Sequence, residues 1–313
     1  MKIDITVPEE IKHWYLDIAK AMFKCCIDAG HDTRITLCQT LDDYGDADLV
    51  VVCGAHYFAE KNIHFLKKPE GVKWAWVQLE QLPYTTLSSD IAMRRWHQTV
   101  QLKEFFDVLI VESPEKKLFL SSQGVENVLV FNCGYHPLYD IQHKLPEFEG
   151  EPQYDVLFYG AITSRRREVL NELLNNGVKL YPFPAKFMEG KDKLFAMRNS
   201  KLVLNIHMND VPYFEKPRLI VDCWSNRNFV VTEHIAYPEV FQAGEHYVSA
   251  DYDNIANAVK ESLKLTHGDR RAVADSAYKH LVENYRLEDS MEQLLVDLEI
   301  LVTESKPVAE VIE

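Results

Sequence analysis

The 313-residue chain is long enough for one large domain or two of medium size, and its length favours two. Its composition, 47% hydrophobic and 11% aromatic, supplies sizeable apolar cores and excludes an intrinsically disordered protein. The formal net charge of −14 repels nucleic acids and anionic membranes at long range, and it therefore argues against DNA binding.

The cysteine pattern and the N-terminal sequence point to a cytoplasmic protein. The six cysteines form no C-x-x-C pair and lie mostly in apolar runs, as is typical of buried free thiols in a reducing compartment. The first residues, MKIDITVPEE, lack the apolar core of a signal peptide, and no apolar run reaches transmembrane length. Peripheral contact with a membrane, through a membrane-linked acceptor, stays open.

Short β-branched strands alternate with helices through the first half of the chain. Strands are predicted over 2–7, 33–37, 48–54, 72–82, 107–113 and 127–134. Helices are predicted over 9–29, near 57–66 and around 88–106, with a short helix before the last strand. This alternation is typical of a parallel sheet that is covered by helices on both faces.

A polar segment rich in proline and acidic residues, 141–153, is predicted to link a domain over 1–140 to a second domain over 154–286. Strands of the second domain are predicted over 154–161, 178–183, 201–208, 228–234 and 246–251. Its helices are predicted over 164–176, near 190–199, around PRLIVDCWS, and over 237–243, 252–265 and 268–285. A helix over 287–304 is expected to pack back on the first domain, ahead of a frayed tail over 305–313.

The sequence therefore predicts an α/β protein of two Rossmann-like, doubly wound domains that face a cleft. In open parallel sheets, ligands bind beyond the carboxyl ends of the strands, so chemistry is expected there.

The first strand of the second domain is followed by FYGAITSRRRE, which is suited to a phosphate group. Gly160 allows a close turn, Ser164 can cap the next helix, and Arg165, Arg166 and Arg167 fall in its first turn. A helix N-terminus with guanidinium groups binds phosphate or diphosphate well. The alternative is a solvated basic helix start.

Two further stretches of the second domain carry candidate binding residues. Asn205 and His207 leave the strand in NIHMND on one side of the chain, although a lone histidine there is often structural. In FEKPRLIVD, Pro217 suits the first turn of a helix, and Glu215, Arg218 and Asp222 follow helical spacing. On an α-helix the two carboxylates share one face with the arginine between them, as suits two polyol groups. The alternative is an ion-pair ladder on a helix surface.

In the first domain, His13, His56 and Glu80 follow predicted strands and are candidate bases that face an acceptor. The alternative for each of them is a structural role without a part in catalysis. The histidines and cysteines do not follow zinc-like spacing, so we predict no metal.

Three stretches resemble the GT-B glycosyltransferases, in particular their CgeB-like and group 1 bacterial subset. WVQLEQL (76–82) looks like a first-domain segment, and FNCGYHPLYD (131–140) looks like the domain boundary. The strongest stretch, LVLNIHMNDVPYFEKPRLIVDCWSNRNFVVTEH (202–234), is similar to the run LNxH, E-x-x-R and VVxE. The resemblance spans residues 75–290 as dispersed short motifs.

The resemblance implies a nucleotide-diphosphate sugar held mainly by the second domain. Asp222 falls where many GT-B enzymes carry a glutamate that holds the donor ribose, and Glu215 lies one position from the usual first carboxylate. The arginines at 165–167 match the region of a basic contact to the diphosphate. The small-Gly-x-Pro pattern that usually follows is replaced by residues 226–229, Asn-Arg-Asn-Phe.

We therefore predict a metal-independent glycosyltransferase (a hexosyl- or pentosyltransferase) of polysaccharide biosynthesis, with a nucleotide sugar and a carbohydrate or surface-polymer acceptor as partners. It needs no further cofactor, because cations stabilise the leaving diphosphate. The proposed donor-binding residues are Gly160, Arg165, Arg166, Arg167, Asn205, His207, Glu215, Arg218 and Asp222. Two alternatives are a sugar-nucleotide epimerase or hydrolase and a catalytically idle subunit that binds nucleotide sugars. A DNA-modifying sugar transferase is disfavoured by the acidic charge.

Overall fold

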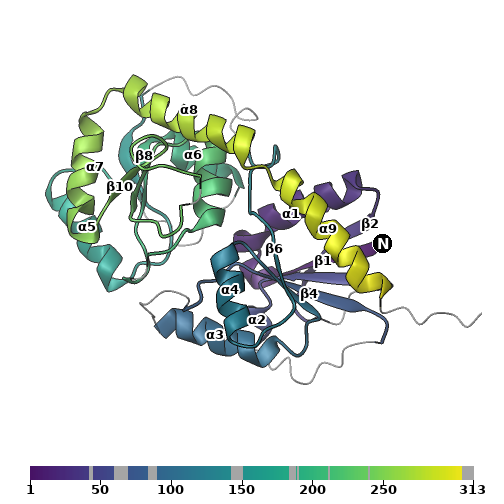
Figure 1. Cartoon of the computed structure of the whole chain (residues 1–313). Coiled ribbons are helices and arrows are strands. Elements are labelled where there is room, and N and C mark those ends of the chain that lie inside the picture. Colours follow the sequence, from purple (N-terminus) through teal and green to yellow (C-terminus); the bar gives the residue numbers. More distant parts are fainter. Residues whose placement is uncertain are drawn as a thin grey trace, which may run out of the picture. The chain divides into compact units, whose positions relative to one another are not determined.

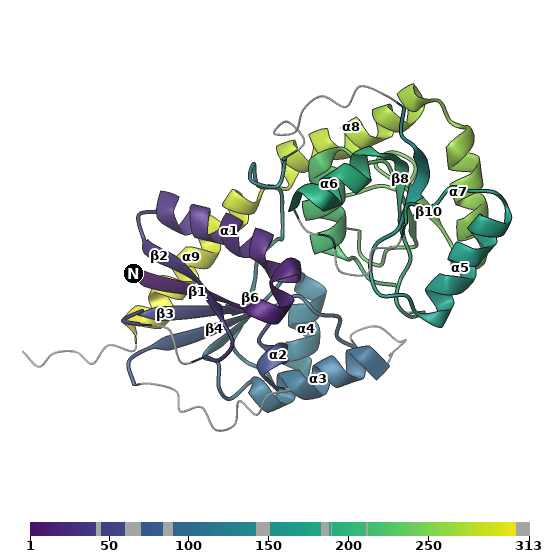
Figure 2. The same ribbon diagram turned by 180° about the vertical axis from the view of Figure 1, so that it is seen from behind.

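The computed structural model describes residues 1–41, 45–59, 70–83, 90–141, 151–182, 188, 190–210, 212–238 and 240–304. The chain divides into two compact units, Met1–Cys133 with Leu287–Glu313, and Gly134–Arg286. Each unit holds one parallel sheet with helices on both faces (Figures 1 and 2). Within the described residues, no helix is long and apolar enough to cross a lipid bilayer.

The first unit is built on a six-stranded parallel sheet of order β2-β1-β3-β4-β5-β6. Its strands are β1 (Lys2–Pro8), β2 (Asp32–Cys38), β3 (Leu49–Cys53), β4 (Lys73–Gln78), β5 (Val108–Val111) and β6 (Val128–Val130). A short 3-10 turn, η1 (Glu9–Ile11), leads into α1 (Lys12–Asp28), which covers one face together with α9 (Leu287–Thr303) (Figure 2). The other face is covered by α2 (His56–Ala59), α3 (Asp90–Leu102) and α4 (Pro114–Ser122).

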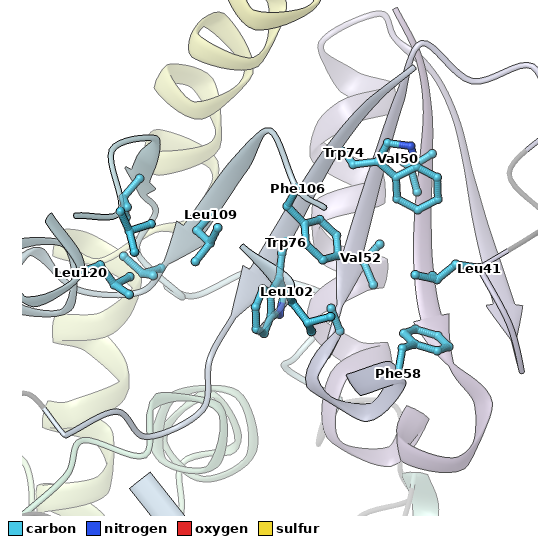
Figure 3. Packing of buried hydrophobic residues seen from close by; sticks show 14 of the residues in the cluster. Leu41, Val50, Val52, Phe58, Trp74, Trp76, Leu102, Phe106, Leu109 and Leu120 are labelled. Carbon is cyan, nitrogen blue, oxygen red and sulfur yellow. The ribbon is translucent and has the colours of Figure 1, made fainter. Parts of the chain in front are cut away.

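Alternation along β4 builds the core beneath α2, α3 and α4. Trp74 and Trp76 pair in register with Val50 and Val52 of β3, so all four side chains lie on the same face of the sheet. They pack with residues of the neighbouring strand and the covering helices, including Phe58, Leu102, Phe106, Leu109 and Leu120 (Figure 3). The two tryptophans are therefore core residues.

The second unit has a four-stranded parallel sheet of order β10-β9-β8-β7. Its strands are β7 (Tyr154–Leu157), β8 (Ser200–Asn205), β9 (Val230–Glu233) and β10 (Val248–Ala250). Helices α5 (Ser164–Asn175) and α7 (Ile255–Lys264) pack on one face. The other face is covered by α6 (Gly190–Arg198), η4 (Pro217–Cys223), η5 (Trp224–Asn226) and α8 (His267–Asn284).

Both sheets reverse their winding direction at one place. In the first unit β1 lies between β2 and β3, and in the second unit β7 lies between Leu180 and β8, because Val156 forms a parallel bridge to Leu180. Ligands of doubly wound sheets bind at the carboxyl ends of the strands at such a reversal. Ligand sites are therefore expected at the ends of β1 and β3 and at the ends of β7 and β8.

Several local predictions differ from the structure. The strand predicted at 178–183 is reduced, in the described residues, to the bridge at Leu180. The segment Pro217–Cys223 is a π-helix and not the expected α-helix, so its turns are wider and the predicted common face does not apply. The helix α5 is capped by Thr163, whose hydroxyl accepts from the Arg166 amide, and Ser164 is its first residue.

Some predicted segments fall on residues outside the described ranges. These are most of the linker at 141–153, the tail at 305–313 and the helix near 57–66 beyond residue 59.

Candidate functional site

The turn after β7 brings two guanidinium groups against a glycine backbone. Gly160 has a φ of +135°, a conformation that residues with side chains rarely adopt. A Cβ atom at Gly160 would lie 2.9 Å from Nη2 of Arg218 and 3.5 Å from Nη1 of Arg166. Glycine therefore allows Arg218 to reach the carboxyl end of β7, close to the N-terminus of α5.

Arg166 and Arg218 are buried and share one carboxylate. Nη2 of Arg166 lies 3.8 Å from Oε1 of Glu215, and Nη1 of Arg218 lies 3.5 Å from Oε2. Burial and the charge of Arg218 lower the pKa of Arg166 to about 10. Burial alone would raise the pKa of Glu215, but the charges of its neighbours, Arg218 first, outweigh burial and lower that pKa. Two cations around one anion favour a further anionic group at this turn.

The other contacts of these arginines join the ends of the two strands at the reversal. Nε of Arg166 donates to the carbonyl of Ile206 at 2.8 Å, and its Nη1 donates to the carbonyl of Ala161 at 3.0 Å. Nη1 of Arg218 donates to Oδ1 of Asn205 at 2.9 Å. The end of β8 is therefore held against the turn that follows β7.

The three arginines of α5 have different surroundings. Both terminal nitrogens of Arg165 donate to the carboxylate of Glu233, at 2.6 and 2.5 Å, and its Nε donates to Asp210 at 2.8 Å. Arg167 is exposed, whereas Arg166 is 1% exposed. Of the predicted triplet, Arg166 is the residue whose guanidinium lies against Gly160 in the described structure.

His207 follows β8 and lies beside this cluster. Its amide donates to Oε2 of Glu233 at 2.7 Å, and its Nε2 lies 2.9 Å from the carbonyl of His234. Its carbonyl accepts from Nη1 of Arg165 at 3.2 Å. Asn205 donates through Nδ2 to Oγ1 of Thr232 at 3.1 Å, so the ends of β8 and β9 are also joined.

Asp222 is held by a second set of side chains, further along η4. Lys193 of α6 donates to its Oδ1 at 2.5 Å, and the hydroxyl of Tyr159 donates to its Oδ2 at 3.2 Å. The guanidinium of Arg218 lies 5.1 Å from the ring centre of Tyr159. Tyr159 therefore connects the two parts of the site, with Glu215 and Arg218 on one side and Asp222 on the other.

In the first unit, the structure brings two of the three predicted bases together. Nε2 of His56 lies 3.7 Å from Oε1 of Glu80, which also accepts from the hydroxyl of Tyr15 at 2.6 Å. Nε of Arg95 donates to the other carboxylate oxygen at 3.1 Å. Burial would raise the pKa of Glu80, but these neighbours, His56 and Arg95 first, lower it to about 2. His13 lies in the first turn of α1, the helix that carries Tyr15.

Lys116 fixes the chain on which Glu80 lies. Its ammonium donates to both oxygens of Glu112, at 2.6 and 2.7 Å, and to the carbonyls of Gln78 and Glu80, at 3.4 and 2.9 Å. Lys116 is 0% exposed, so this ion pair is fully buried. It joins α4 and β5 to the end of β4.

Several residues of these networks were missed by sequence reasoning. Glu233 ends the strand VVTEH, and the rule that polar residues at strand ends are functional candidates could have found it. The same rule could have found Tyr159, which follows β7, whereas Lys193, Tyr15 and Arg95 carry no such signal, because they lie on helices and their partners are distant in the sequence. Within the described residues, histidine, cysteine, aspartate and glutamate do not gather in groups of three or more that could hold a metal ion.

A segment that covers most of the second unit and the first part of α9 resembles a known family in sequence. Residues 160–296, which include Gly160, Arg166, Glu215 and Arg218, match the model of a family described as glycosyl transferase-like. The chain is also 23% identical over 210 residues to the uncharacterized protein L140 of Acanthamoeba polyphaga mimivirus. This match covers 63% of the chain and 66% of the viral protein.

Solved glycosyltransferases resemble the chain in structure. An alpha-glucosyltransferase in complex with UDP and DNA containing an HMU base has a TM-score of 0.61 at 10% identity, covering 97% of this chain and 99% of that one. An alpha1,3-fucosyltransferase with GDP has a TM-score of 0.51 at 12% identity, with coverages of 96% and 90%. A TarM variant of S. aureus in complex with UDP has a TM-score of 0.57 at 12% identity, covering 79% of this chain.

The chain has the GT-B fold of these glycosyltransferases. It spans about half the length of TarM (54%) and about two thirds of the viral relative (66%). Gly160 and the residues around it, Arg166, Glu215 and Arg218, lie in the segment that matches the glycosyl transferase-like family. The narrower assignment to the CgeB-like subset stays a prediction.

Proposed function

We propose that this chain transfers a sugar from a nucleotide-diphosphate sugar to a carbohydrate or surface-polymer acceptor without a metal ion. The observation that carries the proposal is the convergence of Arg166 and Arg218 on Gly160, where the carboxylate of Glu215 lies within 4 Å of both guanidinium groups. A diphosphate supplies the negative charge that this arrangement favours. Because the diphosphate gains charge as it leaves the sugar, the same cations stabilise the transition state more than the bound donor.

The roles of the other donor-side residues are proposed from their contacts around this turn. Asp222 is proposed to bind the ribose, with Tyr159 and Lys193 holding its carboxylate in place. Glu215 orients the donor sugar or the adjacent phosphate. Arg165 is proposed to hold Glu233 and the end of β8 rather than the diphosphate, because its guanidinium is bound to carboxylates.

The candidate residues for the acceptor side are Glu80, His56 and His13, and we assign them different roles. Glu80 is ionised at neutral pH, and Tyr15 and Arg95 already donate to its oxygens. We therefore propose that Glu80 positions its neighbours, and that His56 or His13 takes the acceptor proton if the reaction inverts configuration. The protein is proposed to be cytoplasmic, with peripheral membrane contact if the acceptor is membrane-linked.

The decisive experiment is a thermal-shift and calorimetric screen with UDP-, GDP-, dTDP- and CMP-sugars. A ligand that binds the folded chain raises its melting temperature by mass action. Replacing Arg218 by glutamine is expected to weaken binding of the best nucleotide sugar by about 10- to 100-fold, because a charged hydrogen bond to phosphate is lost. Binding of none of these nucleotide sugars to the unmodified chain would refute the proposal.

Arg167→Gln is the matched control for this experiment. Arg167 is on the same basic helix start but is exposed, so its replacement is expected to leave affinity within about threefold. Equal losses in the two variants would show that general basic charge, and not the pair at Gly160, binds the donor. Addition of EDTA tests metal independence, because turnover is expected to persist in its presence.

Product analysis separates transfer from the alternatives. Release of free sugar without an acceptor indicates a hydrolase, a changed sugar on the nucleotide indicates an epimerase, and binding without turnover indicates an idle subunit. Near-complete coverage by an alpha-glucosyltransferase that was solved with DNA makes a DNA acceptor the second candidate. The net charge of −14 disfavours it, and duplexes with and without HMU bases test it beside carbohydrate acceptors.

A further inference from the structure

The imidazole of His207 is fixed in one orientation with one nitrogen left over. Its Nε2 lies 2.9 Å from the carbonyl of His234, and a carbonyl oxygen can only accept a hydrogen bond. Nε2 therefore carries a proton, and in the neutral ring Nδ1 is an acceptor. The residue is 4% exposed, and its Nδ1 has no hydrogen-bond partner in the described part of the chain.

A buried acceptor without a partner is a costly feature. Leaving such a group unsatisfied is unfavourable, so most buried polar atoms in folded proteins are paired. The main chain at His207 is held because its amide is bound to Glu233 and its carbonyl to Arg165, and the bond from Nε2 to the His234 carbonyl holds the ring. The strand end thus holds Nδ1 in place at a free-energy cost that a ligand with a hydrogen-bond donor would remove.

The position of His207 along the site indicates which part of a donor it meets. Glu215 lies within 4 Å of the guanidinium groups of both Arg218 and Arg166, and Nε of Arg166 donates to the carbonyl of Ile206, the residue before His207. The guanidinium of Arg218 also lies over the ring of Tyr159, whose hydroxyl donates to Asp222. Because the cations at Gly160 contact both Glu215 and Tyr159, we expect a diphosphate bound there to have one flanking group near His207 and Glu215 and the other near Asp222.

The chemistry of Nδ1 distinguishes between the possible groups. A phosphate oxygen only accepts hydrogen bonds and is repelled by a lone pair, whereas a hydroxyl can donate one. With the ribose at Asp222, the group near His207 is the transferred sugar. We propose that Nδ1 of His207 accepts a hydrogen bond from a hydroxyl of the transferred sugar and selects for that hydroxyl. This inference rests on the proposed nucleotide-sugar function and deepens it.

Two substitutions separate the two nitrogens of the ring. In His207→Gln the amide nitrogen takes the place of Nε2 and keeps the bond to the His234 carbonyl, but no acceptor remains at the Nδ1 position. In His207→Asn the amide oxygen takes the place of Nδ1, and the contact to His234 is lost. Gln therefore removes the proposed ligand contact, and Asn removes the structural one.

The measurement is calorimetric affinity for UDP and UDP-glucose, and for GDP and GDP-mannose, in the three proteins. We expect His207→Gln to bind the nucleoside diphosphate like the unmodified chain. Its preference for the nucleotide sugar over the diphosphate is expected to fall about tenfold, as for one lost hydrogen bond. His207→Asn is expected to melt at a lower temperature and to keep that preference within about threefold.

The possible outcomes test the inference about His207 separately from the proposed nucleotide-sugar function. If none of the UDP-, GDP-, dTDP- and CMP-sugars binds the unmodified chain, the nucleotide-sugar function is refuted and the inference with it. If the diphosphates bind but His207→Gln keeps the full preference for the sugar, the inference alone is wrong. A ¹H–¹⁵N spectrum of the imidazole gives an independent readout, because saturating nucleotide sugar, but not diphosphate, is expected to shift Nδ1.

Discussion

Arg227 adopts a backbone conformation that usually belongs to glycine. Its φ and ψ are 51° and 42°, in the left-handed region, at the end of η5. Its guanidinium lies 4.0 Å from the ring centre of Tyr278 on α8. It stands where the resemblance to GT-B enzymes leads one to expect a glycine. The glycine-type turn is therefore kept without the glycine, and stacking on Tyr278 offsets part of the strain.

Arg227→Gly and Arg227→Ala are expected to differ in stability. Glycine removes the left-handed strain of about 1 kcal/mol but loses the stacking, so its unfolding free energy should stay within about 0.5 kcal/mol of the unmodified chain. Alanine keeps the strain and loses the stacking, and should be about 1 kcal/mol less stable than glycine. Urea denaturation of the three proteins measures this, and an alanine variant as stable as the glycine variant would contradict it.

Glu80 makes the stability of the first unit dependent on pH. Its pKa is about 2 in the folded chain and ordinarily 4.5, so the folded state binds fewer protons between these values. Its contribution is therefore fully present above about pH 4.5 and is lost as the pH falls toward 2. Glu80→Gln keeps an oxygen for Tyr15 but removes the charge beside Arg95 and His56.

We expect Glu80→Gln to lower the unfolding free energy by about 2 kcal/mol at pH 7, as for a lost charged hydrogen bond. The difference from the unmodified chain should shrink as the pH approaches 2. Urea titrations at several pH values measure it. A difference that stays constant across this range would mean that the Glu80 charge does not stabilise the fold.

At the scale of elements, the buried pair of Lys116 and Glu112 joins α4 and β5 to the end of β4. Lys116→Met leaves the Glu112 carboxylate buried without its cation, which costs about 3–5 kcal/mol. The double variant Lys116→Met with Glu112→Leu should recover a large part of that loss, because no charge remains buried. Lys117→Met, at an exposed neighbouring position, is the matched control and should change stability by less than about 0.5 kcal/mol.

Thermal and urea unfolding of these four proteins measure the coupling. If the double variant is no more stable than Lys116→Met, the loss comes from the missing bonds to the β4 carbonyls and not from the uncompensated charge.

The sequence predicts the elements well because the periodicity of apolar residues reports which face is buried. The strands at Leu49–Cys53 and Val108–Val111 are apolar throughout, as strands covered on both faces must be. The same information cannot separate an α-helix from the π-helix at Pro217–Cys223, because both bury the same apolar side chains. Nor can it predict which arginine is buried, since Arg166 looks like its exposed neighbour Arg167 until the partner carbonyls are placed.

At the scale of the whole molecule, the chain crosses between its two units twice, at Cys133–Gly134 and at Arg286–Leu287. On the second unit the two crossings are adjacent, because Tyr135 forms a parallel bridge to Arg286 and its amide donates to the carbonyl of Tyr285 at 2.7 Å. Lys216 donates to the hydroxyl of the same Tyr285 at 3.0 Å. The segment that carries Glu215 and Arg218 is therefore bonded directly to the chain that leaves the unit.

The order of the strands indicates where the candidate site lies in the fold, but it does not indicate which side chains contact one another there. The resemblance and the strand order lead to the ends of β7 and β8, where Gly160 and Asn205 lie. The partnership of Lys193 with Asp222 depends on packing between α6 and η4, which no local pattern encodes. Long-range pairs of this kind fix side chains only once the fold is complete.

The return of α9 to the first unit has a consequence for biosynthesis. This helix buries Leu287, Met291, Leu294 and other apolar residues in the first unit and lies against α1. During translation, every residue of Gly134–Arg286 leaves the ribosome before it. The unit that is translated first therefore waits with one face of its sheet partly uncovered until the second unit has emerged, which exposes it to proteases and chaperones for longer.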